Sequence, residues 1–239
     1  MSYRALSRFY DRLMGDFPYR AYVDYIAPRV GEKALDLACG TGEIALALAK
    51  AGLNVHGVDL SQEMLNLAVD KARRAGVTVT FEAGDLRKFA ITHYDVVTCA
   101  SDGLNYVPTK DIKPLMQRVA VCMDGDGRFV FDVSTPYKLR EVLGDNVFYE
   151  DYDDLTYYWE NKWSNRTKSV NMTLTFFERE GETYRRSEDM QKQYAHDMDA
   201  IVEACREAGL MVASVVDGDT FGKVRPKSMR WVFCAKKAR

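Results

Sequence analysis

The sequence predicts an α/β protein in which a doubly wound, mostly parallel sheet carries a smaller antiparallel sheet as an insert. Between residues 33 and 133, short apolar segments of strand length alternate with segments of helix length. Residues 147–194 instead alternate polar with apolar side chains, which is typical of a one-sided antiparallel sheet. The helix-then-strand pattern then returns. We therefore expect residues 1–146 and 195–239 to form one domain around an inserted subdomain of residues 147–194.

The elements of the parallel part follow one another with short connections, which favours right-handed crossovers and helices on both faces of the sheet. The pattern predicts strands at 33–38, 54–60, 77–83, 94–100 and 127–133. It predicts helices between them at 43–52, 62–76 and 111–123. Ser61 is suited to cap the second of these helices. A final helix and two strands add an antiparallel edge, at 199–210, 211–216 and 228–237.

Charge and composition argue against several classes of protein. The chain has 33 basic and 35 acidic residues and a net charge of −2, so no nucleic-acid surface is indicated. Its five cysteines are odd in number and widely spread, which favours reduced thiols in a cytoplasmic protein. We find no signal peptide and no apolar run of membrane-spanning length. No cluster has metal-ligand spacing, so no metal is expected.

The stretch ALDLACGTGE at residues 34–43 contains the strongest functional signal. Asp36 lies in a strand expected to be buried on both faces, where a lone carboxylate is costly unless it is paired. Gly40 and Gly42 let the backbone at a helix N-terminus approach an anionic ligand closely. The letters GTGEIA also fit the loose dinucleotide-binding pattern, and an ordinary strand-to-helix turn is the plain alternative.

Two more carboxylates follow the next two strands of the predicted sheet. Asp59 ends the second strand, where it can accept hydrogen bonds from both hydroxyls of a ribose. Asp85 follows the third strand, where it can accept from the exocyclic amine of a purine. Taken singly, Asp59 is equally a helix-capping loop residue and Asp85 a solvated turn residue. Because the carboxyl ends of parallel strands share one edge, both acids and Asp36 together predict a nucleotide-like ligand there.

Five segments, in this order, resemble the motifs of class I S-adenosylmethionine-dependent methyltransferases. They are ALDLACGTGEIALALAKAG, VHGVDLSQEML, EAGDL, YDVVTCASDGLNYV and GRFVFDVSTPYKL. YDRLMGDFPY, SDGLNYV and QKQY further resemble small bacterial methyltransferases whose insert is an antiparallel sheet, as in glycine and aminosugar N-methyltransferases. The resemblance implies a Rossmann-like, seven-stranded sheet and S-adenosyl-L-methionine as the cofactor.

The resemblance also implies which residues surround the cofactor. Asp36 is expected near the methionine ammonium, Asp59 at the ribose hydroxyls and Asp85 at the adenine amine. The remaining contacts are expected from Ala38, Gly40, Thr41 and Gly42 at the methionine and ribose, from Leu60, Met64 and Leu86 at the adenine, and from Ala100 and Ser101 under the methionyl part. Tyr10 and Tyr19 belong to an expected amino-terminal helical lid, residues 1–30, that closes over the cofactor carboxylate. Aromatic packing of a surface helix is the alternative for both tyrosines.

The methyl acceptor is expected beyond the fourth strand, under the insert. Asp102, Tyr106 and Tyr194 are the predicted catalytic residues, and Asn105 and Gln191 the predicted substrate-binding residues. A period of two does not place Gln191 and Tyr194 on one strand face without a twist or bulge. The insert is interpreted as the roof of this pocket, and a dimerisation surface is the alternative. An acidic, aromatic pocket favours an amine slightly over a phosphate or carboxylate.

The predicted function is methyl transfer to nitrogen or oxygen of a small molecule, by in-line displacement that depends mainly on proximity. Three alternatives remain open at this point. They are an NAD(P)-dependent oxidoreductase, allowed by GTGEIA, a non-catalytic cofactor-binding module, and an RNA methyltransferase, which the near-neutral charge disfavours. The expected oligomeric state is a monomer or a homodimer, with no membrane partner.

Overall fold

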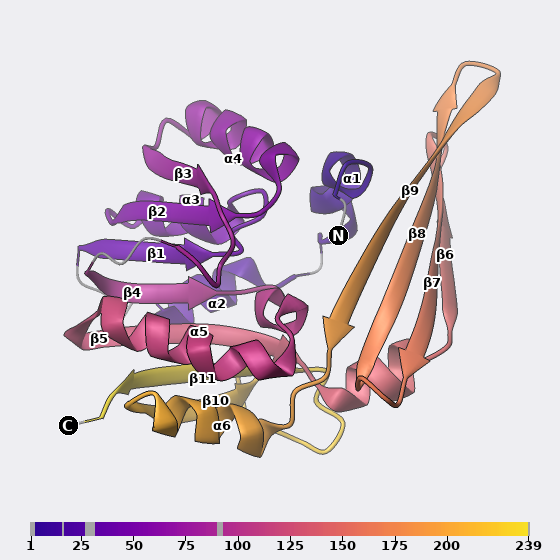
Figure 1. Ribbon diagram of the computed structural model, residues 1–239. Coiled ribbons are helices and arrows are strands. Elements are labelled where there is room, and N and C mark those ends of the chain that lie inside the picture. Colours follow the sequence, from indigo (N-terminus) through magenta and orange to yellow (C-terminus); the bar gives the residue numbers. More distant parts are fainter. Residues whose placement is uncertain (1–2, 16, 27–31, 90–92, 239) are drawn as a thin grey trace.

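Two separate β-sheets form the framework of the protein, and α1 (Leu6–Leu13) lies between them (Figure 1). The computed structural model describes residues 3–15, 17–26, 32–89 and 93–238. The larger sheet has seven strands in the order β10-β11-β5-β4-β1-β2-β3, and the smaller has four in the order β6-β7-β8-β9. The predicted fold class, a mostly parallel seven-stranded sheet with an antiparallel edge and an additional antiparallel sheet, is confirmed.

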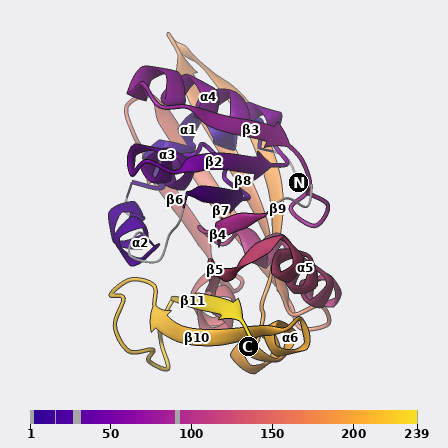
Figure 2. The same ribbon diagram turned by 90° about the vertical axis from the view of Figure 1, so that its left-hand side faces the viewer.

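Five parallel strands form the centre of the larger sheet, where alternate apolar side chains are buried against helices on both faces. They are β1 (Lys33–Leu37), β2 (Asn54–Asp59), β3 (Val79–Ala83), β4 (Tyr94–Cys99) and β5 (Met123–Ser134). One face is covered by α2 (Tyr19–Ile26), α3 (Glu43–Lys50) and α4 (Gln62–Ala75). The other is covered by α5 (Thr109–Cys122) and α6 (Met198–Glu207), as Figure 2 shows. Within the described ranges, no helix has both the length and the apolar character needed to cross a bilayer.

The antiparallel edge is built from β10 (Leu210–Asp217) and β11 (Arg230–Lys237). The last strand, β11, lies inside the sheet between β5 and β10, so that β10 forms the edge. The apolar run of β11 accounts for this order, because Val232 through Ala235 are all buried in the interior of the sheet, whereas β10 is largely half-exposed at its edge. This arrangement brings the start of β11 beside the end of β5, at the carboxyl edge of the parallel strands.

The smaller sheet contains β6 (Val147–Asp151), β7 (Leu155–Ser164), β8 (Ser169–Glu180) and β9 (Thr183–Tyr194). Its inner face packs against α1 and the π-helical turn η3 (Lys138–Leu143), in a cluster that includes Leu6, Leu139, Met172 and Phe176. The helix α2 belongs to a different core, since Tyr22 and Ile26 are buried with α3 under the larger sheet. The two helices of the predicted lid are therefore attached to different sheets. Residues 1–2, 16 and 27–30 of that lid lie outside the described residues.

Candidate active site

A cleft runs along the carboxyl edge of β1, β2 and β4, and we call it the edge cleft. It consists of three adjoining cavities of about 370, 50 and 20 Å³, all of which Ala38 lines. The largest cavity contacts Asp59, Leu60 and Leu86, and the smaller two extend inward to Met64 and Asp36. This is the edge at which ligands of open α/β sheets bind.

Asp36 is buried at the inner end of the edge cleft, with 1% of its surface exposed. One carboxylate oxygen, Oδ1, accepts a hydrogen bond from the Thr98 hydroxyl at 2.6 Å. The other oxygen, Oδ2, has no hydrogen-bond partner among the described residues. Burial raises the pKa of Asp36 to about 7, against the opposing effect of Thr98. An unpartnered buried carboxylate that lines a cavity fits a cationic group of a ligand.

Asp59 fastens the glycine loop to the end of β2. Its Oδ2 accepts from the backbone N–H of Gly40 at 2.8 Å, and its Oδ1 accepts from the N–H of Ser61 at 2.8 Å. The carboxylate also lines two cavities of the edge cleft, where its remaining lone pairs can accept from hydroxyl groups. Gly40 has a φ of +54°, and a Cβ there would meet no atom within 4 Å. The backbone is thus open to a ligand at Gly40.

Gly42 does not have the role predicted for it. Its φ is +85°, and a Cβ would lie 2.9 Å from Leu46 Cδ1 and 3.0 Å from Ala68 Cβ. Gly42 therefore allows α3 and α4 to pack closely and does not line the edge cleft. Thr41 lines the innermost cavity, but its hydroxyl donates to Asp11 Oδ1 of α1 at 2.6 Å. This hydrogen bond attaches α1 to the glycine loop.

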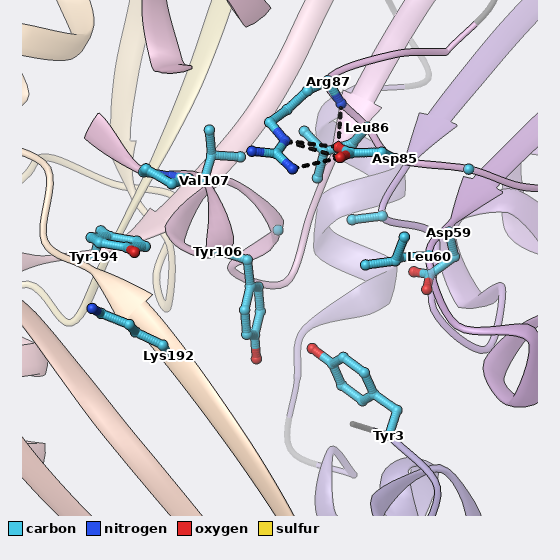
Figure 3. Close-up of a pocket in the computed structure, with 14 residues that line it drawn as sticks. Tyr3, Asp59, Leu60, Asp85, Leu86, Arg87, Tyr106, Val107, Lys192 and Tyr194 are labelled. Carbon is cyan, nitrogen blue, oxygen red and sulfur yellow. Dashed lines mark hydrogen bonds and ion pairs between the residues drawn. The ribbon is translucent and has the colours of Figure 1, made fainter. Parts of the chain in front are cut away.

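Asp85 lies at the rim of the edge cleft and is already paired. Arg87 Nη2 lies 2.6 Å from Asp85 Oδ2 (Figure 3). The same guanidinium contacts Asp111 at 3.0 Å. The side-chain hydrogen bond from Arg87 lowers the pKa of Asp85. Asp85 and Leu86 both line the largest cavity, as predicted, whereas Arg87 was not foreseen from the sequence.

Tyr194 faces the edge cleft and not the pocket under the insert, which corrects the sequence-based placement. Figure 3 shows Tyr194 and Lys192 of β9 on one side of the cavity and Asp59 and Leu60 on the other. The Lys192 ammonium lies 4.9 Å from the centre of the Tyr194 ring. The edge cleft is therefore lined by both sheets, and not by the parallel-sheet domain alone.

A second cavity, the inner pocket, lies between α1, η3 and the inner face of the smaller sheet. Its volume is about 140 Å³, and it is separated from the edge cleft by the shared side chains of Tyr10, Ser101 and Tyr106. Its walls are mainly apolar and aromatic, from Leu6, Leu13, Met14, Leu143, Tyr157, Trp159, Met172 and Leu174. Gln191 also lines it and accepts a hydrogen bond from Tyr106 Oη at 2.7 Å. Gln191 and Tyr194 thus face different cavities, as their spacing along β9 predicts.

The tyrosines of the predicted lid both reach the innermost cavity. Tyr10 Oη lies 3.2 Å from Ser101 Oγ, and Tyr19 lines the same cavity from α2. Ala100 and Ser101 line it from the end of β4. Their common position beside Asp36 is consistent with the contacts expected for the methionyl part of the cofactor.

Two consecutive polar residues after the end of β4 are held in a strained backbone. Ser101 and Asp102 have φ values of +58° and +66°, which residues other than glycine rarely adopt. The carboxylate of Asp132 holds this turn by accepting from the N–H groups of Ser101 and Asp102, each at 2.8 Å. Arg230 Nη1 lies 2.6 Å from Asp132 Oδ1 and also contacts Asp102. A buried charge cluster therefore fixes the boundary between the two cavities.

Asp102 and Asn105 do not have the functions predicted from the sequence. Burial would raise the pKa of Asp102, but Arg230 and Lys138 overcome this effect and lower it to about 2. That carboxylate also accepts from Ser134 Oγ at 2.8 Å, so it is already engaged by groups of the chain itself. Asn105 is fully buried, with its side chain bonded to the backbone of Ser134 and Tyr194. Both ends of its amide are therefore engaged by the backbone.

Comparison with known proteins agrees with this geometry. Residues 34–127 match the family model described as a methyltransferase domain. A protein of Geobacillus sp. (strain WCH70) named as a methyltransferase is 31% identical over 247 residues, covering 99% of this chain and 100% of the relative. The chain belongs to the methyltransferase family. A crystal structure of an S-adenosylmethionine-dependent methyltransferase from Clostridium acetobutylicum ATCC 824 has a TM-score of 0.90 and 32% identity, covering 99% of both chains.

The fold of this methyltransferase, including its second sheet, is shared more widely. An amino pentose methyltransferase from Micromonospora echinaspora has a TM-score of 0.73 at 18% identity, covering 92% of this chain and 90% of that one. The predicted resemblance to methyltransferases, including those that act on aminosugars, is confirmed at the level of the fold.

Several residues that line the two cavities of this methyltransferase were missed by sequence reasoning. They are Tyr3, Arg87 and Lys192 at the edge cleft and Lys138 and Gln193 at the inner pocket. Asp132 was also missed, although it lies within the apolar run FVFDV much as Asp36 lies within the run ALDLA. Arg230 is likewise a charged residue at the start of the apolar strand β11. A charged residue within an apolar strand was the signal that could have found both.

Proposed function

We propose that this methyltransferase transfers a methyl group from S-adenosyl-L-methionine to a small-molecule acceptor bound in the inner pocket. The observation that supports this most is the shared boundary between the edge cleft and the inner pocket. The edge cleft contains the carboxylates suited to the cofactor, and the inner pocket offers a separate, smaller space beside it. Tyr10, Ser101 and Tyr106 form their common boundary, where the reacting atoms would meet.

The residues of the edge cleft fit the chemical groups of this cofactor. The free oxygen of Asp36 suits the methionine ammonium, and Asp59 suits the ribose hydroxyls. Leu60, with 65% of its surface exposed beside the largest cavity, and Leu86 offer apolar contact to the adenine. Asp85 is paired with Arg87, so it can accept from the adenine amine either beside that contact or in exchange for it.

The protein contributes orientation and exclusion of water. The sulfonium of the cofactor supplies an activated methyl group and a neutral leaving group. The chain then has to hold the acceptor atom in line with the carbon–sulfur bond in a dry site. The inserted sheet, residues 147–194, provides one wall of the inner pocket through Tyr157, Trp159 and Met172. We assign it the role of a roof that selects the acceptor.

Calorimetry with S-adenosylmethionine, its demethylated product and NAD tests the cofactor. We expect both sulfur compounds to bind and NAD to show no binding. Incubation with methyl-labelled S-adenosylmethionine and a metabolite extract of the source organism then tests transfer. Binding without any labelled small molecule would favour a non-catalytic module, and label recovered only in RNA would favour an RNA methyltransferase. Either result contradicts the proposal.

A further inference from the structure

The inner pocket contains hydrogen-bond donors that nothing in the described chain satisfies. Gln191 has 6% of its surface exposed, and its Nε2 has no partner among the described residues. Nε1 of Trp159, on the neighbouring part of the same pocket wall, is also buried and unpartnered within the described ranges. Buried donors are normally paired, so two such groups lining one cavity indicate that a ligand supplies the acceptors.

A positive charge also lines this pocket. Lys138 Nζ lies 3.6 Å from Asp102 Oδ2, but that carboxylate is shared with Arg230 and with the hydroxyl of Ser134. Burial lowers the pKa of Lys138, and the charge of Asp102 opposes this effect. Asp102, the single carboxylate among the described residues that line the pocket, is therefore already paired. The side chains of Gln191, Trp159 and Lys138 line the same pocket as hydrogen-bond donors.

Among the described residues that line the inner pocket, no carboxylate or phenol is suited to remove a proton near neutral pH, and the Lys138 amine is engaged by the carboxylate of Asp102. The carboxyl of Asp102 has a pKa of about 2 and is held by ion pairs. Burial raises the pKa of Tyr106 to about 12 and raises that of Tyr157. His196 does not line the pocket, because it is buried with its Nε2 3.3 Å from the carbonyl oxygen of Leu104. An acceptor that must lose a proton before it attacks finds no base here.

From the donors and the missing base together, we infer that the methyl acceptor is an organic anion and that its ionised oxygen receives the methyl group. The inference rests on the proposed function. Gln191, Trp159 and Lys138 would bind the oxygen-bearing end of the acceptor, and the aromatic walls would cover its apolar body. This class contains carboxylates and acidic enols or phenols that are ionised at neutral pH.

Such an acceptor also balances the transfer without any proton movement. A lone pair of the anionic oxygen forms the new bond to the methyl carbon. The carbon–sulfur bond breaks, and its electron pair stays on sulfur. The negative oxygen and the positive sulfur both become neutral, so the chain neither gives nor takes a proton. An amine fits less well, because a protonated amine must first lose a proton and would lie beside Lys138. This reverses the slight preference for an amine that the sequence alone suggested.

The charge of the true acceptor tests the inference. A metabolite extract of the source organism is separated by ion exchange at pH 7 into anionic, neutral and cationic fractions, and each is incubated with the protein and methyl-labelled S-adenosylmethionine. We expect a labelled product from the anionic fraction that no longer binds the anion exchanger, because methylation removes the charge. A product from another fraction, or one that carries the methyl group on nitrogen, overturns the inference but leaves the proposed function intact. No product from any fraction overturns the proposed function itself.

Two variants at one position then test the role of the donors. Gln191→Leu should raise the KM for the acceptor by about fivefold, through loss of one hydrogen bond. Gln191→Glu places a carboxylate against an anion and should raise KM by at least tenfold more. Met190→Gln, on the exposed outer face of the same strand, is the matched control and should change nothing. Cofactor affinity within twofold of wild type shows that the variants are folded. Equal or better acceptor binding by Gln191→Glu overturns the inference.

Discussion

The hydroxyl of Tyr106 donates to Gln191 Oε1 across 2.7 Å and so connects the two sheets at the boundary of the two cavities. Tyr106 lies in the 3-10 turn η2 (Gly103–Tyr106) after β4, and Gln191 lies on the inner face of β9. Tyr106 lines the edge cleft as well as the inner pocket. This one hydrogen bond therefore links the proposed cofactor site to the proposed acceptor site.

Replacement of Tyr106 by Phe should affect the acceptor and not the cofactor. The lost hydrogen bond frees Gln191 to rotate, and we expect turnover to fall by roughly two- to tenfold, in line with one uncharged hydrogen bond. Calorimetry should show cofactor affinity within twofold of wild type. Tyr194→Phe is the matched comparison, because Tyr194 lies in the edge cleft, and it should leave the KM for the acceptor unchanged. Equal acceptor defects in both variants would contradict this separation of the cavities.

Asp59→Ala should weaken cofactor binding strongly. The variant loses a charged acceptor for the ribose and also releases the backbone N–H groups of Gly40 and Ser61. We expect a loss of about 1.5–3 kcal/mol in binding free energy, measured by calorimetry with S-adenosylmethionine. Asp70→Ala, at an exposed carboxylate on α4, is the control and should bind normally. Unchanged affinity in Asp59→Ala would show that the ribose lies elsewhere.

Asp36 predicts a specific pH dependence of stability. Its pKa is raised by burial from 3.8 to about 7, so between these values the folded state binds more protons than the unfolded state. Stability should therefore fall as pH rises from about 4 to about 7 and stay level above that range. The free energy of unfolding of Asp36→Asn should not fall over this pH range. At pH 8 the variant should be more stable than wild type by on the order of 1–3 kcal/mol, and below pH 4 it should not be more stable. Urea unfolding of the ligand-free proteins at several pH values measures it, and a gain independent of pH would contradict the assignment.

Arg230 should be essential for folding stability. It is 7% exposed and compensates both Asp102 and Asp132, so Arg230→Met leaves two buried carboxylates with too little positive charge. Breaking a buried ion pair on one side costs about 3–5 kcal/mol in the free energy of unfolding. Arg206→Met is the control, since its pair with Glu203 is largely exposed and its loss should change stability little. Urea unfolding at pH 7 compares the two, and a similar small loss in both would contradict the role of the cluster.

Methyl transfer should need no divalent metal. The sulfonium already activates the methyl group, and within the described ranges no three His, Cys, Asp or Glu side chains are grouped to hold an ion. We expect unchanged turnover of labelled S-adenosylmethionine in the presence of excess chelator. Loss of turnover that magnesium restores would instead indicate metal-assisted transfer.

The sequence by itself determined the layered fold and part of the lining of the edge cleft. Strand and helix periods depend on local spacing, and the carboxyl ends of parallel strands must share an edge, so Asp36, Asp59 and Leu86 could be placed together without coordinates. The change of period at residue 147 likewise identified the second sheet. Local patterns were sufficient because each of these features follows from neighbours in the chain.

Only the tertiary structure decided which side chains are free to act. Asp102 looked like a free carboxylate after β4, but Arg230, 128 residues away in the chain, occupies it. The side-chain amide of Asn105 likewise donates to the backbone carbonyl oxygens of Ser134 and Tyr194, which are distant in the chain. The donors of the inner pocket come from η3, β7 and β9, which contact one another only after folding. Availability for hydrogen bonding depends on partners that are distant in sequence, and no local pattern encodes them.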